Sequence, residues 1–197
     1  MNSSTAVSLD ALRARIRELE GQHVLQRRPP SGVAVVDQLI GGLPLPGILE
    51  ISGSLGSGRT RLAVSLIAAL AGRFPAAWVD PLRRFFPPAA AQQGVDLQQL
   101  LLVRPEKDRE SWAVEQLCRA GCFPVVVVMD PHPLGRAWQR WIHAAEAGGC
   151  TLVVLTERMA RSLPACVRMG VSEGKVSVVR DRHGCAGASM AWGQPWV

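Results

Sequence analysis

The chain has 197 residues, of which 48% are hydrophobic and 19% charged, a balance that predicts one domain with a full hydrophobic core. A net charge of +6 and a pI near 9.7 favour anionic neighbours such as nucleic acid or an acidic protein surface, although an ordinary basic soluble protein fits equally well. The sequence shows no apolar run long enough for a membrane span, no secretory signal and no paired cysteine spacing, so we expect a cytoplasmic protein without a membrane partner.

An amphipathic helix is predicted first, over Ser8–Glu20, with Ser8 as its N-cap. Its apolar residues follow one another at spacings of three and four, which produces a narrow seam on one face. The seam consists of Leu9, Leu12, Ile16 and Leu19. A polar, proline-containing linker over 22–31 separates this helix from the rest, so residues 1–31 are predicted to be a unit whose seam contacts either its own domain or another chain.

From Gly32 onward, predicted strands and helices alternate, which is typical of an α/β domain with a mostly parallel sheet. The predicted strands are Leu49–Ser52, Ala76–Val79, Leu100–Val103, Val125–Met129, Thr151–Leu155, Cys166–Val171 and Lys175–Val179. The last two are joined by a short turn and form an antiparallel hairpin. The predicted helices are Thr60–Ala71, Arg109–Ala120, Leu134–Ala147 and approximately Glu157–Ser162.

A phosphate-binding loop is predicted between the first strand and the first of these helices. The stretch Gly53-Ser54-Leu55-Gly56-Ser57-Gly58-Arg59-Thr60 has the spacing G-x-x-x-x-G-K-[ST], with arginine where lysine is expected. Its glycines would let backbone N–H groups surround phosphate oxygens, and the hydroxyl of Thr60 would bind Mg²⁺. The planar guanidinium of Arg59 keeps the positive charge but replaces a compact ammonium, so ATP or ADP with Mg²⁺ is expected to bind weakly if at all.

Two aspartates end strands near this loop. Asp130 follows the buried strand Val125–Met129, where a carboxylate that holds Mg²⁺ through water is expected, and Asp80 follows Ala76–Val79. No glutamate follows Asp80 to orient a water, so we predict no catalytic residues and no efficient ATP hydrolysis. The candidate nucleotide-binding residues are Gly53, Gly56, Ser57, Gly58, Arg59, Thr60 and Asp130, with Asp80 as a further possibility.

These motifs resemble those of the RecA-like ATPases over about residues 31–130. The resemblance rests on Gly41-Gly42-Leu43-Pro44, Gly47-Ile48-Leu49-Glu50-Ile51, Trp78-Val79-Asp80 and Val125–Asp130. It implies a truncated RecA-like domain over 32–197. It also implies that the catalytic glutamate of the family would fall at Leu82, two residues after Asp80.

The chain departs from the recombinases after Asp130. About 20 residues separate Asp130 from Thr151 and about ten separate Leu155 from Cys166, which leaves no room for two long DNA-binding loops. Strand exchange is therefore not expected. The short chain, the N-terminal helix and the altered loop resemble the ImuA family, which is related to the division inhibitor SulA.

This resemblance implies a non-hydrolysing accessory protein of error-prone translesion synthesis, induced by DNA damage in bacteria. The implied partners are an ImuB-like protein and an error-prone polymerase, with RecA itself as a further candidate. DNA binding, if it occurs, is expected to be weak. A nucleotide-switched, DNA-dependent ATPase and a SulA-like inhibitor of the division protein FtsZ are the alternatives.

Several other residues leave two interpretations open. Trp138 and Trp141 fit either a core or an interface, and Trp192 and Trp196 fit either a partner site or packing onto the chain itself. Arg83-Arg84-Phe85-Phe86 is typical of some single-strand binders, and equally of a loop with two buried phenylalanines. A basic face is possible at Arg158, Arg161, Arg168, Arg180 and Arg182.

The histidines lack the spacing of metal ligands, so no metal site is predicted.

Overall fold

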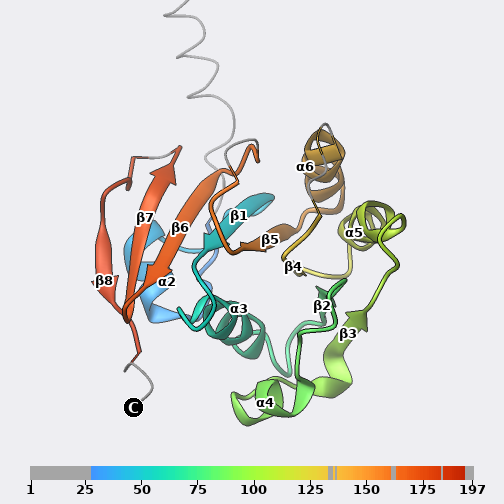
Figure 1. Ribbon diagram of the computed structural model, residues 1–197, viewed down its shortest axis with the longest axis horizontal. Coiled ribbons are helices and arrows are strands. Elements are labelled where there is room, and N and C mark those ends of the chain that lie inside the picture. Colours follow the sequence, from blue (N-terminus) through green and yellow to red (C-terminus); the bar gives the residue numbers. More distant parts are fainter. Residues whose placement is uncertain (1–27, 133–134, 136, 161–162, 183, 194–197) are drawn as a thin grey trace, which may run out of the picture.

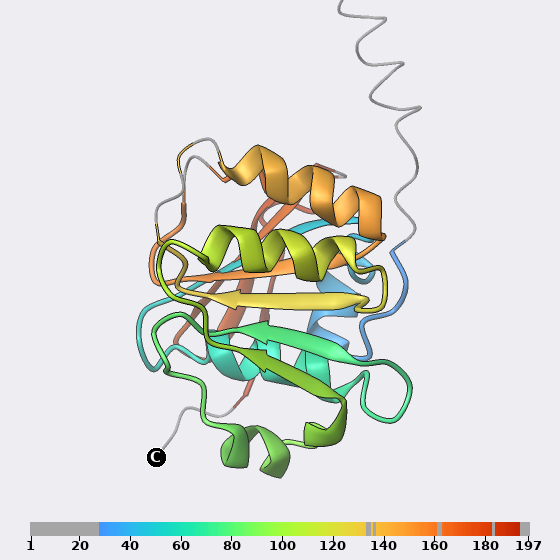
Figure 2. The ribbon, with the colours of Figure 1, turned by 90° about the vertical axis from the view of Figure 1, so that its right-hand side faces the viewer.

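An eight-stranded sheet forms the centre of the computed structural model (Figures 1 and 2). The structure describes residues 28–132, 135, 137–160, 163–182 and 184–193. The strands are β1 (Gly47–Ser52), β2 (Ala76–Val79), β3 (Leu100–Val103), β4 (Val125–Met129), β5 (Thr151–Thr156), β6 (Val167–Ser172), β7 (Lys175–Asp181) and β8 (Ser189–Ala191). The helices are α2 (Ala34–Ile40), α3 (Arg59–Ala68), α4 (Pro87–Gln92), α5 (Glu110–Arg119) and α6 (Ala137–Gly148), with a 3₁₀ turn at Leu97–Gln99.

The strand order is β3-β2-β4-β5-β1-β6-β7-β8. The first six of these strands are parallel, and β7 and β8 run antiparallel to their neighbours. The predicted hairpin is confirmed: Ser172 pairs with Lys175, and the two residues between them, Glu173 and Gly174, have φ values of 49° and 70°. Positive φ at both turn residues gives the strand twist that a tight hairpin requires. The predicted α/β class with a mostly parallel sheet is therefore confirmed.

Two layers of helix cover the sheet (Figure 1). Helices α5 and α6 bury one face against residues such as Ile48, Val126 and Leu152. Helices α2, α3 and α4 bury the other face, where Leu49 and Ile51 lie. Because the central strands contact helices on both faces, they need apolar residues at every position, which is why β4 is an unbroken apolar run.

Trp138 and Trp141 belong to the core under α6. They are 6% and 0% exposed, and their rings meet edge to face with centroids 5.0 Å apart. The indole N–H of Trp141 donates to the carbonyl oxygen and the hydroxyl of Ser111, each at 3.2 Å. These contacts satisfy the polar edge of the buried ring, so packing is the role of this pair.

Some predicted elements differ from the observed ones. Helix α2, helix α4 and strand β8 were not predicted, whereas the helix expected near Glu157–Ser162 is absent from the described residues 157–160. Strand β8 is three residues long and pairs with Lys175–Ser177, so Trp192 lies at the end of a strand. Among the described residues, no helix is long and apolar enough to cross a membrane.

The segment just before α2 packs on the sheet. Arg28 donates to both carboxylate oxygens of Asp181 on β7, at 2.9 and 2.6 Å, and to the carbonyl oxygen of Ile40 at 2.6 Å. The seam residues Leu9, Leu12, Ile16 and Leu19 lie outside the described residues. The contacts of that predicted seam stay a prediction.

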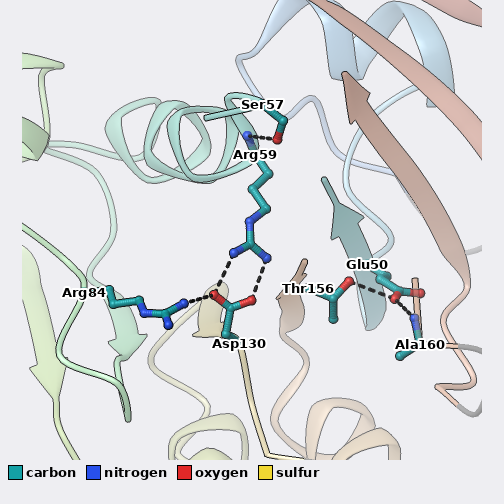
Figure 3. A network of polar contacts seen from close by, with 7 residues as sticks. All are labelled: Glu50, Ser57, Arg59, Arg84, Asp130, Thr156 and Ala160. Atoms are coloured by element: carbon teal, nitrogen blue, oxygen red, sulfur yellow. Dashed lines mark hydrogen bonds and ion pairs between the residues drawn. The ribbon is translucent and has the colours of Figure 1, made fainter. Parts of the chain in front are cut away.

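A buried charge pair lies within the sheet, between β1 and β6. Glu50 on β1 is fully buried, and one of its carboxylate oxygens accepts hydrogen bonds from the Thr156 hydroxyl at 3.1 Å and the Ala160 N–H at 2.6 Å (Figure 3). The other oxygen lies 3.1 Å from Nε of Arg168, which is itself 8% exposed and also donates to the carbonyl oxygens of Ala160 and Leu163. Arg168 is therefore an interior residue and does not belong to the basic face considered above.

The buried carboxylate of Glu50 makes stability depend on pH. Burial raises the pKa of Glu50 above its ordinary value of 4.5, although its hydrogen bonds and Arg168 act in the opposite direction. The folded state therefore keeps a proton at pH values where the unfolded chain has lost it. As a result, the free energy of unfolding falls as the pH rises from about 4.5 through the folded-state pKa, by up to about 1.4 kcal/mol per pH unit.

We expect Glu50→Gln to remove this contribution, since the amide oxygen keeps an acceptor for Ala160 N–H but does not titrate. Urea unfolding at a series of pH values measures the slope in both proteins. The slope, rather than the absolute stability, is the readout, because the variant also removes the partner charge of Arg168. Identical slopes in the two proteins would contradict the assignment.

Candidate nucleotide-binding site

The glycine-rich loop connects the end of β1 to the start of α3, as predicted. Gly56 and Gly58 have φ values of 80° and 96°, which side chains other than glycine rarely adopt. At Gly53 the constraint is space: a Cβ there would lie 2.3 Å from the Ser57 hydroxyl and 2.6 Å from the carbonyl oxygen of Val171. The three glycines of the motif are thus required by the backbone path itself.

The loop encloses a small hollow of about 210 Å³, lined by residues 54–56 and 58–61. No described residue accepts a hydrogen bond from the backbone N–H of Gly56 or Gly58. These N–H groups and the start of α3 supply positive potential of the kind that binds anions. The hollow is smaller than the roughly 300 to 1,000 Å³ of most small-molecule sites, so it offers room for a phosphate group rather than an enclosed pocket for a nucleotide.

The side chain of Arg59, which lines this hollow, binds Asp130. Its two terminal nitrogens donate to the two carboxylate oxygens of Asp130, each at 2.6 Å, and Arg59 is only 4% exposed (Figure 3). A planar guanidinium matches a carboxylate in this way, whereas an ammonium forms a single point contact. Arginine at the position of the motif lysine therefore joins the loop to the end of β4.

A second arginine reaches the same carboxylate from the loop after β2. Arg84 lies 3.3 Å from Asp130, and its side chain is 50% exposed. Asp130 has a φ of 46° and its side chain is 13% exposed. The aspartate expected to hold Mg²⁺ is thus paired with two guanidinium groups, one buried and one at the surface.

Thr60 and Asp130 are the residues that would hold Mg²⁺, and their arrangement does not fit that ion. Mg²⁺ binds oxygen ligands at about 2.0 to 2.1 Å and keeps several of its waters, so Asp130 would hold the ion by accepting hydrogen bonds from one of those waters. Both oxygens of Asp130 instead accept short hydrogen bonds from a cation at the same place. The described residues contain no other group of three acidic, histidine or cysteine side chains suited to a metal ion.

Asp80, the other strand-end acid, is fully buried and holds the backbone of the next loop. Its oxygens accept hydrogen bonds from the N–H groups of Arg84 and Phe85, at 2.8 and 3.0 Å, and Arg104 Nε lies at 3.4 Å. Leu82, at the position where the resemblance places a catalytic glutamate, is 39% exposed. Neither residue presents a carboxylate to the hollow.

One neighbour of the loop was not predicted. Trp192, just after β8, packs so close to Gly58 that a Cβ on that glycine would lie 3.3 Å from its ring. The guanidinium of Arg61 lies 5.4 Å from the centre of the same ring. No pattern in the sequence links Trp192 to Gly58. Of the two interpretations that the sequence leaves open for Trp192, its contact with Gly58 favours packing onto the chain itself. Trp196 lies outside the described residues.

Comparisons with known proteins identify the family of the chain. The family model described as the RecA N-terminal domain matches residues 19–134, which is more than half of the chain. The chain belongs to the RecA N-terminal domain family. Its similarity to RecA of Thermus aquaticus is 40% identity over 91 residues, and to RecA of Chlorobium limicola 42% over 91 residues.

Each of these matches covers 45% of this chain, but only 27% and 26% of the two RecA proteins. This RecA-family chain therefore spans about a quarter of the curated relatives that it matches. A solved structure described as the RadB recombinase shares the fold, with a TM-score of 0.67 at 18% identity over 81% of this chain and 92% of that one.

The pair of Arg59 and Asp130 is open to a direct test. Asp130→Asn keeps the side-chain size and tolerates the positive φ of this position, but leaves the buried Arg59 without a countercharge. We expect a loss of about 3 kcal/mol in the free energy of unfolding, measured by urea denaturation.

Arg84→Gln is the matched control for this measurement, because it removes the exposed partner of the same carboxylate. It should cost less than about 1 kcal/mol. Equal costs for Asp130→Asn and Arg84→Gln would show that the buried pair does not stabilise the fold.

Proposed function

We propose that this RecA-family protein is a non-hydrolysing accessory factor of DNA-damage-induced, error-prone translesion synthesis that acts through protein contacts. Its family membership supports a role in DNA repair or recombination. The resemblance to ImuA proteins supports the narrower role. The proposed partners are an ImuB-like protein and an error-prone polymerase, with RecA as a further candidate.

The observation that carries the non-hydrolysing part is the ion pair of Arg59 with Asp130. Binding of Mg·ATP in the manner of the motif requires a cation on the phosphates and a free carboxylate for the metal. Here the cation and the carboxylate neutralise each other at 2.6 Å. Separating them would leave the buried Arg59 without its countercharge, so nucleotide binding is weakened by the cost of breaking the pair.

Hydrolysis needs, in addition, a group that orients a water molecule. Leu82 has no such group, and the oxygens of Asp80 already accept three donors beneath the loop. Between β4 and β5 the described chain contains helix α6, which supports the expectation that long DNA-binding loops are missing there. Any DNA contact of this protein would then be weak.

A nucleotide-switched, DNA-dependent ATPase is the second candidate, and one observation favours it. The hollow of the glycine loop is open, and the N–H groups of Gly56 and Gly58 have no acceptor among the described residues. A phosphate that enters this hollow could compete with Asp130 for the guanidinium of Arg59. If the chain works as such a switch, nucleotide binding would break the ion pair of Arg59 with Asp130.

The two candidates differ in turnover and in the effect of restoring the lysine. We expect the wild-type protein to release no phosphate from Mg·ATP, with or without single-stranded DNA. Arg59→Lys should strengthen the binding of a fluorescent ATP analogue in the presence of Mg²⁺, since an ammonium does not occupy both oxygens of Asp130. ATP turnover by the wild-type protein at rates typical of RecA would overturn the accessory role.

The partner-binding part of the proposal rests on the predicted seam of Leu9, Leu12, Ile16 and Leu19. We expect Leu12→Asp with Ile16→Asp to abolish capture of an ImuB-like protein from cells treated with a DNA-damaging agent. Ala14→Asp is the control, because it adds an aspartate to the opposite side of the predicted helix. If the seam variant still captures the ImuB-like protein, the seam is not its binding site.

A further inference from the structure

The loop between β2 and α4, which we call the display loop (residues 81–86), presents exposed side chains of two kinds. Leu82 and Phe86 are 39% and 65% exposed, which is unusual for side chains of this size. Arg83 and Arg84 between them are also exposed. The loop thus offers apolar and cationic groups together at the carboxyl edge of the sheet, beside the glycine loop.

A buried network holds the display loop in place from below. Asp80 binds two of its backbone N–H groups, and Arg104 Nη2 donates to the carbonyl oxygen of Phe85 at 3.2 Å. The ring of Phe85 packs on Trp78 at a centroid distance of 4.3 Å. A fully buried aspartate and a buried aromatic pair therefore support a loop whose other side chains face outward.

Arg83 shows that this geometry is imposed on the loop. Its φ of 56° is uncommon for a residue other than glycine or asparagine, and its N–H donates to the carbonyl oxygen of Asp80 at 3.2 Å. Such backbone strain persists only where the surroundings enforce it, and it concentrates at functional sites. A loop fixed in advance loses little conformational entropy when it binds, which favours affinity.

The chemistry of the loop indicates the kind of partner. Asp80, which is buried, and Asp130, which is 13% exposed, are the acids in contact with it. Both are already paired with arginines, so the exposed charges of the loop are positive. Arginine and phenylalanine are enriched at protein interfaces. Single-stranded nucleic acid instead requires several exposed stacking surfaces, and here Phe85 is buried on Trp78, which leaves Phe86 as the one exposed aromatic ring of the loop.

We propose that the display loop docks an acidic segment of a partner protein, with the apolar side chains of that segment contacting Leu82 and Phe86 and its carboxylates pairing with Arg83 and Arg84. This proposal rests on the proposed accessory function, because each assumes that the protein acts by binding another protein. It names a different surface from the N-terminal seam, however, and the tests of turnover and of the seam do not decide it.

The test is selection from a random-peptide phage library on the immobilised full-length protein, in parallel with the double variant Leu82→Ser, Phe86→Ser. The matched control is Phe74→Ser with Leu97→Ser, which removes an exposed phenylalanine and an exposed leucine just before β2 and β3, at the opposite edge of the sheet. Thermal unfolding followed by circular dichroism checks that each variant is folded.

We expect acidic peptides with leucine or aromatic residues to be enriched on the wild type and the control, but not on the display-loop variant. Their synthetic versions should bind at least tenfold more weakly to that variant, and replacement of their acids by amides should have a similar effect. Failure to select any peptide that depends on the display loop, or selection of neutral or basic peptides, would overturn the proposal. So would an oligo(dT) whose binding is lost in the display-loop variant, since nucleic acid would then be the ligand.

Discussion

The bidentate pair of Arg59 and Asp130 connects the two halves of the carboxyl edge of the sheet. Arg59 begins helix α3 directly after the glycine loop, whereas Asp130 ends the central strand β4, 71 positions later in the chain. Their contact fixes the start of α3 over the end of β4, which lies two strands away from β1 in the sheet. The same contact pairs the cation of the glycine loop with the carboxylate at the end of β4.

The arginines of this edge neutralise the acids that an ATPase keeps available. Asp130 is paired with Arg59 and Arg84, and Asp80 with Arg104. Because each acid is largely buried, it no longer contributes negative charge to the surface, while parts of Arg84 and Arg104 remain exposed. The pairing of these acids and the exposed positive charge of Arg84 therefore have one physical origin.

The strands and the glycine loop could be predicted because local patterns determine them. A strand that is buried on both faces needs apolar residues throughout, and Val125–Met129 has them. The glycines of the loop could be recognised because Gly56 and Gly58 adopt positive φ, which few other residues tolerate. Helix α2 was not predicted because it has only seven residues, several of them β-branched, which gives it a weak intrinsic helix propensity. Burial of its apolar residues and the C-cap at Gly41 stabilise it instead. The contacts of Arg59 with Asp130, and of Trp192 with Gly58, join distant segments, and no periodicity in the sequence reveals them.

Arg59 stands where a phosphate-binding loop has a lysine, and the two side chains differ in how they contact a neighbouring carboxylate. Lysine contributes charge to the phosphates while its compact ammonium leaves the metal-binding aspartate free. Arginine keeps the charge, and its fork can bind a carboxylate through two parallel hydrogen bonds, as it does here with Asp130. The glycine loop itself depends on glycines at positive φ and on the start of α3, and both are present with arginine at this position. A RecA-family fold can therefore retain the shape of a nucleotide site while its charged groups stabilise the fold.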